Sequence, residues 1–349
     1  MSVYTVTPSQ AEKSIARAIS VGHVAILKSD PGMGKSALIR SIAEKYNLKL
    51  IDLRVTQLLP EDFNGLPMRD QEKAIYAVFE MFPLEGEPLP EGYDGWLIFL
   101  DELPSGSKSI QAASYKLLLD KMVGQRKLHP HVAMVAAGNL ETSGAIVTRM
   151  GTAQQSRLLH YSLIVDPNEA LDIFARCGYD TRIQAFLEWK PDLIHRFQPD
   201  HSEDTFPCMR TWEFASDMIK GIPTEEIEVH DIAACVGDGA AAEAMLYFKE
   251  FGNLPTYAQV MADPQGAPVP NNPGARFAMS SMLMSGDLDN EVGTVLKYLE
   301  RFPGEFQVIF LRLLCRAHPE MHRHKDVIPH RTRINRIATG RESSNAVAA

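Results

Sequence analysis

The chain has 349 residues, of which 45% are hydrophobic and 23% are charged, a composition typical of a globular protein large enough for two domains. The formal net charge of −9 argues against a dedicated duplex-DNA binder, which usually carries a basic face. Four scattered cysteines without a CxxC pair indicate neither a disulfide framework nor a zinc site, and with no signal peptide or membrane-length apolar run we expect a cytoplasmic protein without membrane insertion.

The N-terminal half alternates short apolar strands with helical patterns. The first helix is expected over "TPSQAEKSIARAISVG", with Thr7 as its N-cap and Gln10 completing a capping box. The strands that follow are expected at His23–Lys28, Leu48–Arg54, Trp96–Leu100, Val132–Ala137 and Tyr161–Val165. This alternation predicts an α/β fold with a parallel five-stranded sheet, helices on both of its faces, and a ligand beyond the carboxyl ends of the strands.

One connection, at about residues 55–95, is too long for a simple crossover between strands. It is rich in proline and glycine, and its middle, "KAIYAVFEMF", is apolar enough for a strand or a short hairpin. A structured insertion of this length inside a compact domain is usually functional.

From about residue 166 the strand pattern gives way to helices. "TRIQAFLEWKPDLIHRF" and "VHDIAACVGDGAAAEAMLYFKEFG" are each read as helical, and we expect a helical lid over 166–245. A Pro/Asn-rich break at 262–274 lies within a helical C-terminal extension, 246–349. The extension ends in a basic tail, which we interpret as a solvated chain end in preference to a nucleic-acid contact.

The turn after the first predicted strand has the features of a phosphate-binding loop. It ends in Gly34-Lys35-Ser36 and fits G-x-x-x-x-G-K-[ST] except at the first position, which is Ser29. Backbone N–H groups in such a loop hold phosphates, the lysine reaches the β- and γ-phosphates, and the hydroxyl coordinates Mg²⁺. We therefore expect ATP to contact Asp30, Pro31, Gly32, Met33, Gly34, Lys35, Ser36 and Ala37.

Two later strand ends supply the remaining polar groups. The strand in "WLIFLDEL" leads to Asp101 and Glu102. Asp101 can share the Mg²⁺ site with Ser36, and Glu102 can polarise an attacking water. "VAMVAAGN" ends in Asn139, which can orient that water or sense the γ-phosphate. A helix N-cap pair and a turn-forming asparagine are the alternatives, and the upstream loop favours the catalytic interpretation.

In this order the motifs resemble those of the AAA+ ATPases, over roughly residues 8–220, and within them the MoxR-like branch. The resemblance implies that Arg157, with Arg149 as second candidate, reaches the γ-phosphate of a neighbouring subunit, and that Arg210 is the lid arginine called sensor 2. It also implies that the insertion faces a central pore. Residues 1–165 are then the nucleotide-binding core of a P-loop NTPase.

By the same resemblance, the protein is a homo-oligomeric ring, expected to be a hexamer, that hydrolyses ATP to remodel or activate a partner protein. Relatives often act with a partner that bears a von Willebrand factor A domain. The alternatives are a nucleic-acid motor or loader, supported locally by the basic tail alone, and a small-molecule kinase, which Asp101, Glu102 and Asn139 suit less well than they suit water activation. His318, His322 and His324 have metal-like spacing but read as a solvated helix end.

Overall fold

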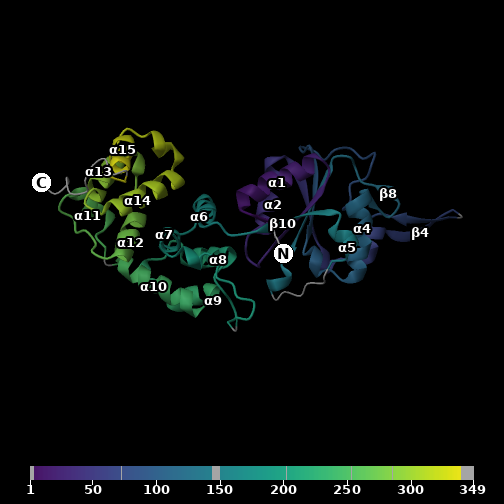
Figure 1. The fold of residues 1–349 in the computed structure, drawn as a ribbon, viewed down its shortest axis with the longest axis horizontal. Helices are drawn as coiled ribbons and strands as arrows, with labels where there is room; N and C mark the ends of the chain where they lie inside the picture. Colours follow the sequence, from purple (N-terminus) through teal and green to yellow (C-terminus); the bar gives the residue numbers. More distant parts are fainter. Residues whose placement is uncertain are drawn as a thin grey trace. The chain divides into compact units, whose positions relative to one another are not determined.

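The computed structural model describes residues 4–71, 73–143, 150–201, 203–252, 254–284 and 286–338. Contacts within the chain divide it into two units, Met1–Asp166 with Phe197–His201, and Pro167–Arg196 with Ser202–Ala349. The first unit is built on a β-sheet, and the second is helical throughout its described residues (Figure 1). None of the described helices combines the length and apolar character that a membrane crossing requires.

The first unit contains a parallel sheet in which the strand order is β1-β10-β2-β9-β6-β3. The strands are β1 Thr5–Val6, β2 Val24–Ser29, β3 Leu48–Arg54, β6 Gly95–Asp101, β9 Val132–Asn139 and β10 Leu158–Leu163. The predicted fold class is confirmed. One strand was not predicted: the two residues of β1 pair with β10 and make the sheet six-stranded.

Helices cover both faces of this sheet because successive apolar side chains of a strand point to opposite faces, so that both faces are apolar. In β2, Ala25 and Leu27 pack with α1 (Pro8–Ser20) and α2 (Lys35–Lys45). Val24 and Ile26 point to the other face, where α4 (Lys108–Asp120) lies. The predicted capping box of α1 is present, since Thr7 Oγ1 accepts from Gln10 N and Gln10 Oε1 accepts from Thr7 N.

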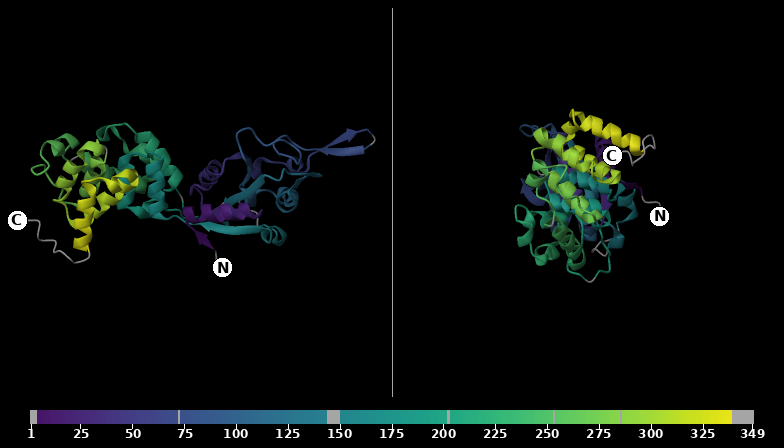
Figure 2. Two further views of the ribbon diagram at one scale, coloured as in Figure 1. Left: turned by 90° about the horizontal axis from the view of Figure 1, so that it is seen from above. Right: turned by 90° about the vertical axis from the view of Figure 1, so that its left-hand side faces the viewer.

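The long insertion contains a short helix and an antiparallel hairpin. The hairpin strands β4 (Leu66–Asp70) and β5 (Lys73–Ala77) extend away from the sheet (Figures 1 and 2). Of the two predicted forms of "KAIYAVFEMF", the strand is confirmed as β5, and its partner β4 lies before this stretch. The remaining elements of the unit are η1 Val55–Gln57, α3 Pro60–Asn64, η2 Leu103–Ser105, β7 Met122–Val123, β8 Arg126–Lys127, η3 Glu141–Ser143 and α5 Thr152–Gln155, where η denotes a 3₁₀ helix.

The second unit packs its helices around an aromatic cluster and a larger aliphatic core. Trp212, Tyr247 and Phe186 are fully buried, the Phe186 ring contacts the other two, and Trp212 Nε1 donates to Leu193 O at 2.7 Å. The elements are α6 Pro167–Arg176, α7 Thr181–Trp189, η4 Pro191–Leu193, α8 Met209–Ile219, η5 Thr224–Glu226, α9 Val229–Val236, α10 Asp238–Gly252, α11 Tyr257–Ala262, α12 Pro273–Leu283, α13 Leu288–Leu299, α14 Gly304–Ala317, η6 Pro319–Arg323 and α15 Val327–Ala338.

Two segments predicted as continuous helices are broken in the structure. Pro191 ends the first, because proline cannot donate the hydrogen bond that would continue α7. Gly237 divides the second into α9 and α10 at a φ of 85°, a backbone conformation that favours glycine.

A buried ion pair lies at the start of α7, and its guanidinium also donates a hydrogen bond to the end of α8. Arg182 and Asp180 are 7% and 9% exposed, and Arg182 Nη2 lies 2.7 Å from Asp180 Oδ2. The remaining guanidinium donors reach Asp180 Oδ1 and the carbonyls of Ile219 and Ile222. With its donors satisfied in this way, the guanidinium cross-links three segments of the helical unit.

Arg182→Met is expected to lower the free energy of unfolding by about 3–5 kcal/mol, because it leaves the Asp180 carboxylate buried without its partner. Urea denaturation followed by the fluorescence of Trp189 and Trp212 measures the loss. Arg176→Met is the matched control, since Arg176 is exposed and donates only to its own helix. A loss no larger than the control's would contradict the structural role of the pair.

Candidate active site

The phosphate-binding loop connects β2 to α2 at the carboxyl edge of the sheet. Ser29 is the last residue of β2, and α2 begins at Lys35. Gly32 and Gly34 have φ values of 75° and 74°, which allow the backbone to curl between these two elements. Gly34 gives α2 no side-chain cap, so the first-turn N–H groups and the positive end of the helix are available to bind an anion.

Ser29 occupies the first position of the loop motif without backbone strain. It has no positive φ and pairs in register with Asn139 of β9, so the glycine of the motif is not required at this point. Its side chain is fully buried, and its hydroxyl accepts a hydrogen bond from Lys35 Nζ at 2.8 Å. Lys35 Nζ also donates to Asn139 Oδ1 at 3.0 Å. Two adjacent strands thus hold the ammonium group at the loop.

Ser36 and the two acidic residues of β6 form the second part of the cluster. Ser36 Oγ donates to Asp101 Oδ2 at 3.2 Å, which brings together the two side chains predicted to hold Mg²⁺. Glu102 follows directly in the left-handed region, at a φ of 58°. Its carboxylate accepts from Thr56 Oγ1 at 2.8 Å, and Thr56 lies just beyond the carboxyl end of β3. Glu102 is therefore turned toward the neighbouring strand.

Close packing between β9 and η2 fixes the backbone around Glu102. A Cβ atom on Gly138 would lie 2.3 Å from Cδ of Pro104, a separation that real atoms do not adopt. Gly138 therefore permits η2 to approach β9, and η2 begins immediately after Glu102. The carboxylate of Glu102 is placed by this approach as well as by Thr56.

The other loop residues predicted to contact nucleotide occupy different environments. Asp30 Oδ1 accepts from Ser143 Oγ of η3, which ties the loop to the segment after β9. Met33 is buried in the core beside α1 and α2, so its side chain anchors the loop and only its backbone is available to a ligand. Pro31 is half-buried and Ala37 is exposed on the first turn of α2.

One further charge lies in the strand that leads to the loop. Burial lowers the pKa of Lys28, and the nearby Glu141 carboxylate opposes this by raising it. Among the described residues, no group of three or more His, Cys, Asp and Glu side chains could hold a metal ion. Mg²⁺ does not need such a group, because it commonly binds through one or two protein oxygens together with water and substrate phosphates.

The three arginines expected from the family resemblance have different positions. Arg157 immediately precedes β10, at the amino edge of the sheet, where Leu158 pairs with Val24. Five residue steps along β2 separate that edge from Ser29, or about 16 Å, so Arg157 cannot reach the loop of its own chain. Arg149 falls outside the described residues. Arg210 is exposed on α8 of the second unit, and its role stays a prediction.

Sequence reasoning missed three polar residues that complete the cluster. Ser29 was interpreted as a departure from the motif, yet it hydrogen-bonds Lys35. Thr56 and Ser143 were not predicted, and they contact Glu102 and Asp30 respectively. The position of Thr56 just after a predicted strand end was the available signal, since parallel strands end at one edge.

Ser29→Ala is expected to strengthen ATP binding about five- to tenfold, because Lys35 then breaks one hydrogen bond fewer when it turns to a phosphate. Titration calorimetry with ATP and Mg²⁺ measures the dissociation constant. Ser41→Ala is the matched control, since Ser41 is exposed on α2 and its hydroxyl donates to Leu38 O. Unchanged or weaker binding in Ser29→Ala would show that its hydroxyl does not compete for the ammonium group.

The chain was compared with solved structures, curated proteins and protein families. Among solved structures, the chain is similar to a mutant of Thermotoga maritima RuvB, at 12% identity and a TM-score of 0.33 over 95% of this chain and 91% of that one. It is also similar to the Thermotoga maritima RuvB Holliday junction branch migration motor, at 13% identity and a TM-score of 0.33 over 95% and 87%. Likenesses at this score support no conclusion on function. No curated protein matches the chain.

The family comparison is the informative one. Residues 25–157 match the model of the AAA family, described as the ATPase family associated with various cellular activities. The matched range begins in β2 and ends just before β10, so it includes the phosphate-binding loop, Asp101, Glu102 and Asn139. The part of the first unit that carries the candidate site is therefore similar to this ATPase family.

Proposed function

We propose that this protein hydrolyses ATP in a Mg²⁺-dependent reaction and works as a homo-oligomeric AAA+ ring of the MoxR-like branch that remodels or activates a partner protein. The observation that carries the ATPase proposal is one polar cluster at the carboxyl edge of the sheet. It unites Lys35 with Asn139 and Ser36 with Asp101, and Glu102 follows Asp101 directly. This is the set of groups that hydrolysis of a phosphoanhydride requires.

Each residue has a defined task in this proposal. Lys35 and the N–H groups at the start of α2 bind the phosphates, and Ser36 and Asp101 are the residues that would hold Mg²⁺. When bound, Mg²⁺ neutralises charge on the β- and γ-phosphates. Glu102 accepts a proton from the attacking water after leaving Thr56, and Asn139 orients that water after releasing Lys35.

Glu102→Gln is expected to reduce the ATPase rate by about 10²–10⁴-fold, because the amide cannot accept the proton, while ATP binding is retained. Phosphate release measures the rate, and titration calorimetry measures binding. Glu141→Gln, an exposed acidic residue of η3, is the control. Equal turnover in Glu102→Gln and wild type would remove Glu102 as the general base.

The ring proposal depends on the position of Arg157. Its guanidinium is exposed, donates to Ala153 O at 3.1 Å and lies 5.9 Å from the Tyr115 ring centre. Distance excludes it from its own phosphate loop, whereas a cation at this edge is available to the loop of an adjacent subunit. An arginine supplied in this way contributes about 10³–10⁵-fold in rate where it has been measured.

A subunit-mixing experiment tests this arrangement. Arg157→Ala and Glu102→Gln are each expected to be nearly inactive alone, yet their mixture is expected to recover activity, because an intact site on one subunit meets an intact arginine on the other. Phosphate release is measured against total protein concentration, with assembly followed by light scattering. Arg126→Ala, an exposed arginine of the same unit, is the control.

Two results would contradict the ring. One is a wild-type rate per subunit that does not change with concentration or with the Arg157→Ala substitution. The other is a mixture no more active than its components. Either result would favour an enzyme in which each chain works alone.

The proposed substrate is a polypeptide, and the β4–β5 hairpin supports this choice. Leu66, Met68 and Ile75 lie on one face of the hairpin and are 46%, 55% and 43% exposed, and Met68 is directly opposite Ile75. An exposed apolar face suits contact with apolar side chains better than contact with phosphates. We assign the chain to the MoxR-like branch on the position of this insertion between β3 and β6, and a von Willebrand factor A domain is the expected feature of its partner.

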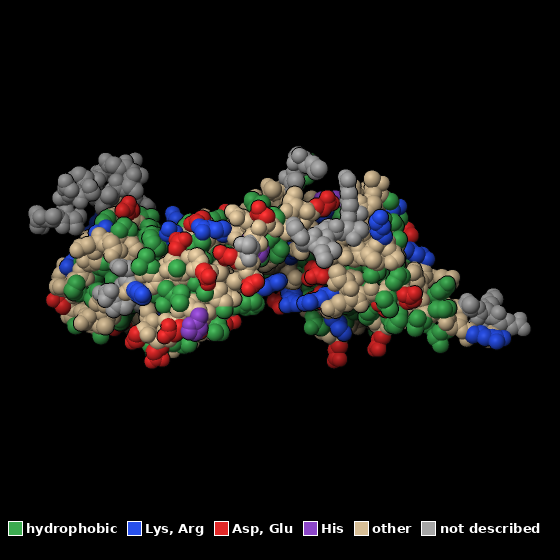
Figure 3. Space-filling model, turned by 90° about the horizontal axis from the view of Figure 1, so that it is seen from below, with side chains coloured by type: hydrophobic (Ala, Val, Ile, Leu, Met, Phe, Trp, Pro, Cys, Tyr) green, Lys and Arg blue, Asp and Glu red, His purple; other side chains and the backbone are tan. Residues whose placement is uncertain are grey.

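The charge distribution weighs against the nucleic-acid alternative. The net charge is −9, and Figure 3 shows both acidic and basic side chains on the face that is drawn, with one group of basic side chains near the middle of the view. A nucleic-acid motor gathers cations along the path of the phosphate backbone. ATPase activity stimulated about tenfold or more by single-stranded or duplex DNA, with no response to an unfolded protein, would replace the proposed substrate class.

A further inference from the structure

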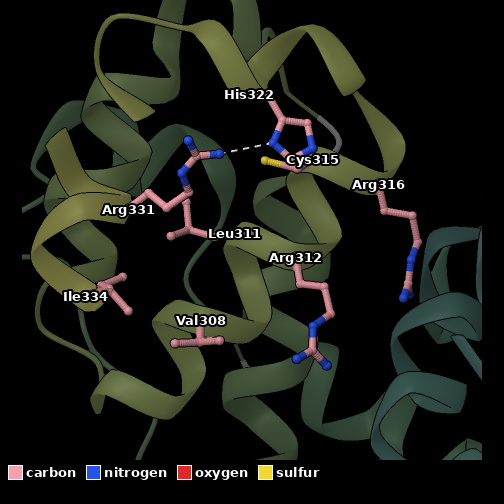
Figure 4. Close-up of a pocket in the computed structure, with 8 residues that line it drawn as sticks. All are labelled: Val308, Leu311, Arg312, Cys315, Arg316, His322, Arg331 and Ile334. Atoms are coloured by element: carbon pink, nitrogen blue, oxygen red, sulfur yellow. Dashed lines mark hydrogen bonds between the residues drawn. The ribbon is translucent and has the colours of Figure 1, made fainter. Parts of the chain in front are cut away.

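A cavity lies within the helical unit, formed by α14, η6 and α15 (Figure 4). Its volume is about 380 Å³, within the range of small-molecule sites. Residues at helical spacing on α14 form one wall, and the 3₁₀ helix and α15 form the rest. The lining residues are Val308, Leu311, Arg312, Cys315, Arg316, His322, Arg331 and Ile334.

The lining of this cavity has an apolar part and a cationic part. Val308, Leu311 and Ile334 supply its aliphatic surface, and Leu311 and Ile334 are themselves buried in the core of the unit. The described lining residues include three arginines and no carboxylate. A ligand that fits both parts has an apolar body and a negative group.

The three arginines are not equivalent. Arg316 is paired with Asp172 at 2.5 Å and with Glu188 at 3.0 Å, so its charge is already compensated within the fold. Arg312 is exposed and makes no hydrogen bond or ion pair with any described residue. Arg331 Nη1 lies 3.1 Å from Nδ1 of His322, the side chain that it faces in Figure 4. Neither Arg312 nor Arg331 has an acidic partner among the described residues.

The contact with His322 directs Arg331 without cancelling its charge. A guanidinium has no acceptor, so the imidazole nitrogen must accept this hydrogen bond. Among the described residues, the guanidinium has no further hydrogen-bond partner, so its other donors are open to a ligand beside Cys315, on the α14 wall (Figure 4). The thiol of Cys315 is close enough to Arg331 to be affected by its charge. Burial raises the pKa of Cys315, and the positive charge of Arg331 partly lowers it again.

We propose that this cavity is a binding site for a small organic carboxylate with an apolar body, whose carboxylate pairs with Arg331 and Arg312 while the body covers Val308, Leu311 and Ile334. Arginine suits this task because its planar fork matches a carboxylate. The site belongs to the helical unit and is separate from the phosphate-binding loop of the first unit.

Alkylation of Cys315 gives a direct measurement of occupancy. The full chain carrying Cys177→Ser removes the exposed cysteine, and Cys208 and Cys235 are buried. Iodoacetamide labelling of Cys315 is followed by mass spectrometry above neutral pH, where more of the thiol is ionised. At ten times its dissociation constant, 4-phenylbutyrate is expected to slow labelling about tenfold.

Two further probes separate the contributions of charge and apolar surface. The alcohol 4-phenylbutan-1-ol has the same body without the charge, and acetate has the charge without the body. Both are expected to protect Cys315 far less than 4-phenylbutyrate at equal concentration. Because this comparison uses one folded protein, it holds even where a cavity variant folds poorly.

Arginine variants then identify the cationic part of the site. Arg331→Met is expected to raise the dissociation constant of 4-phenylbutyrate about tenfold or more, through loss of a charge-assisted hydrogen bond. Arg323→Met is the matched control, because Arg323 is an exposed arginine of the same region that does not line the cavity.

Three results would overturn the proposal. The alcohol could protect Cys315 as well as the acid does. Arg331→Met could bind the acid as tightly as Arg323→Met. Protection by a peptide that ends in leucine with a free carboxyl group, but not by 4-phenylbutyrate, would assign the cavity to a polypeptide C-terminus and reject the small ligand.

Discussion

The position of the Lys35 ammonium group depends on the parallel pairing of β2 with β9. In register, Ser29 is opposite Asn139, so two polar side chains meet where the strands end and hold one cation between them. A shift of one residue in either strand would turn one of these side chains to the opposite face of the sheet. The sheet register, rather than the loop alone, therefore determines where the ammonium group of Lys35 is held.

At the same edge, the side chains proposed to act on ATP are all hydrogen-bonded to other groups of the protein. Lys35 is bound to Ser29 and Asn139, Ser36 to Asp101, and Glu102 to Thr56. A nucleotide would have to exchange these contacts for its own phosphates and water, so part of its intrinsic affinity is used to break them. In the proposed reaction, this exchange also frees Glu102 and Asn139 when a substrate is present, so that water activation is coupled to binding.

Much of the first unit could be predicted from the sequence because its signals are local. The loop glycines, the apolar strands and the polar residue at each strand end are short patterns that tertiary packing does not override. β1 was missed because two residues carry no periodicity, and the contact of Thr56 with Glu102 depends on which strands are neighbours. In the helical unit, the helix breaks at Pro191 and Gly237 were not predicted, because the apolar pattern continues on both sides of each residue. The roles of Arg149, Arg157 and Arg210, and the boundary at residue 245, remain predictions because they concern other subunits or the movement of parts.

The short strand β1 has a consequence for the solution behaviour of the protein. A sheet ends in strands with unpaired N–H and C=O groups, and such an edge can recruit a strand from another molecule. Thr5 and Val6 cover β10 on that side, and at the other side β3 carries the charged side chains of Lys49, Asp52 and Arg54. A variant shortened by the first seven residues would expose the backbone of β10 and would be prone to aggregate through edge-to-edge pairing, although every residue of the catalytic cluster would still be present.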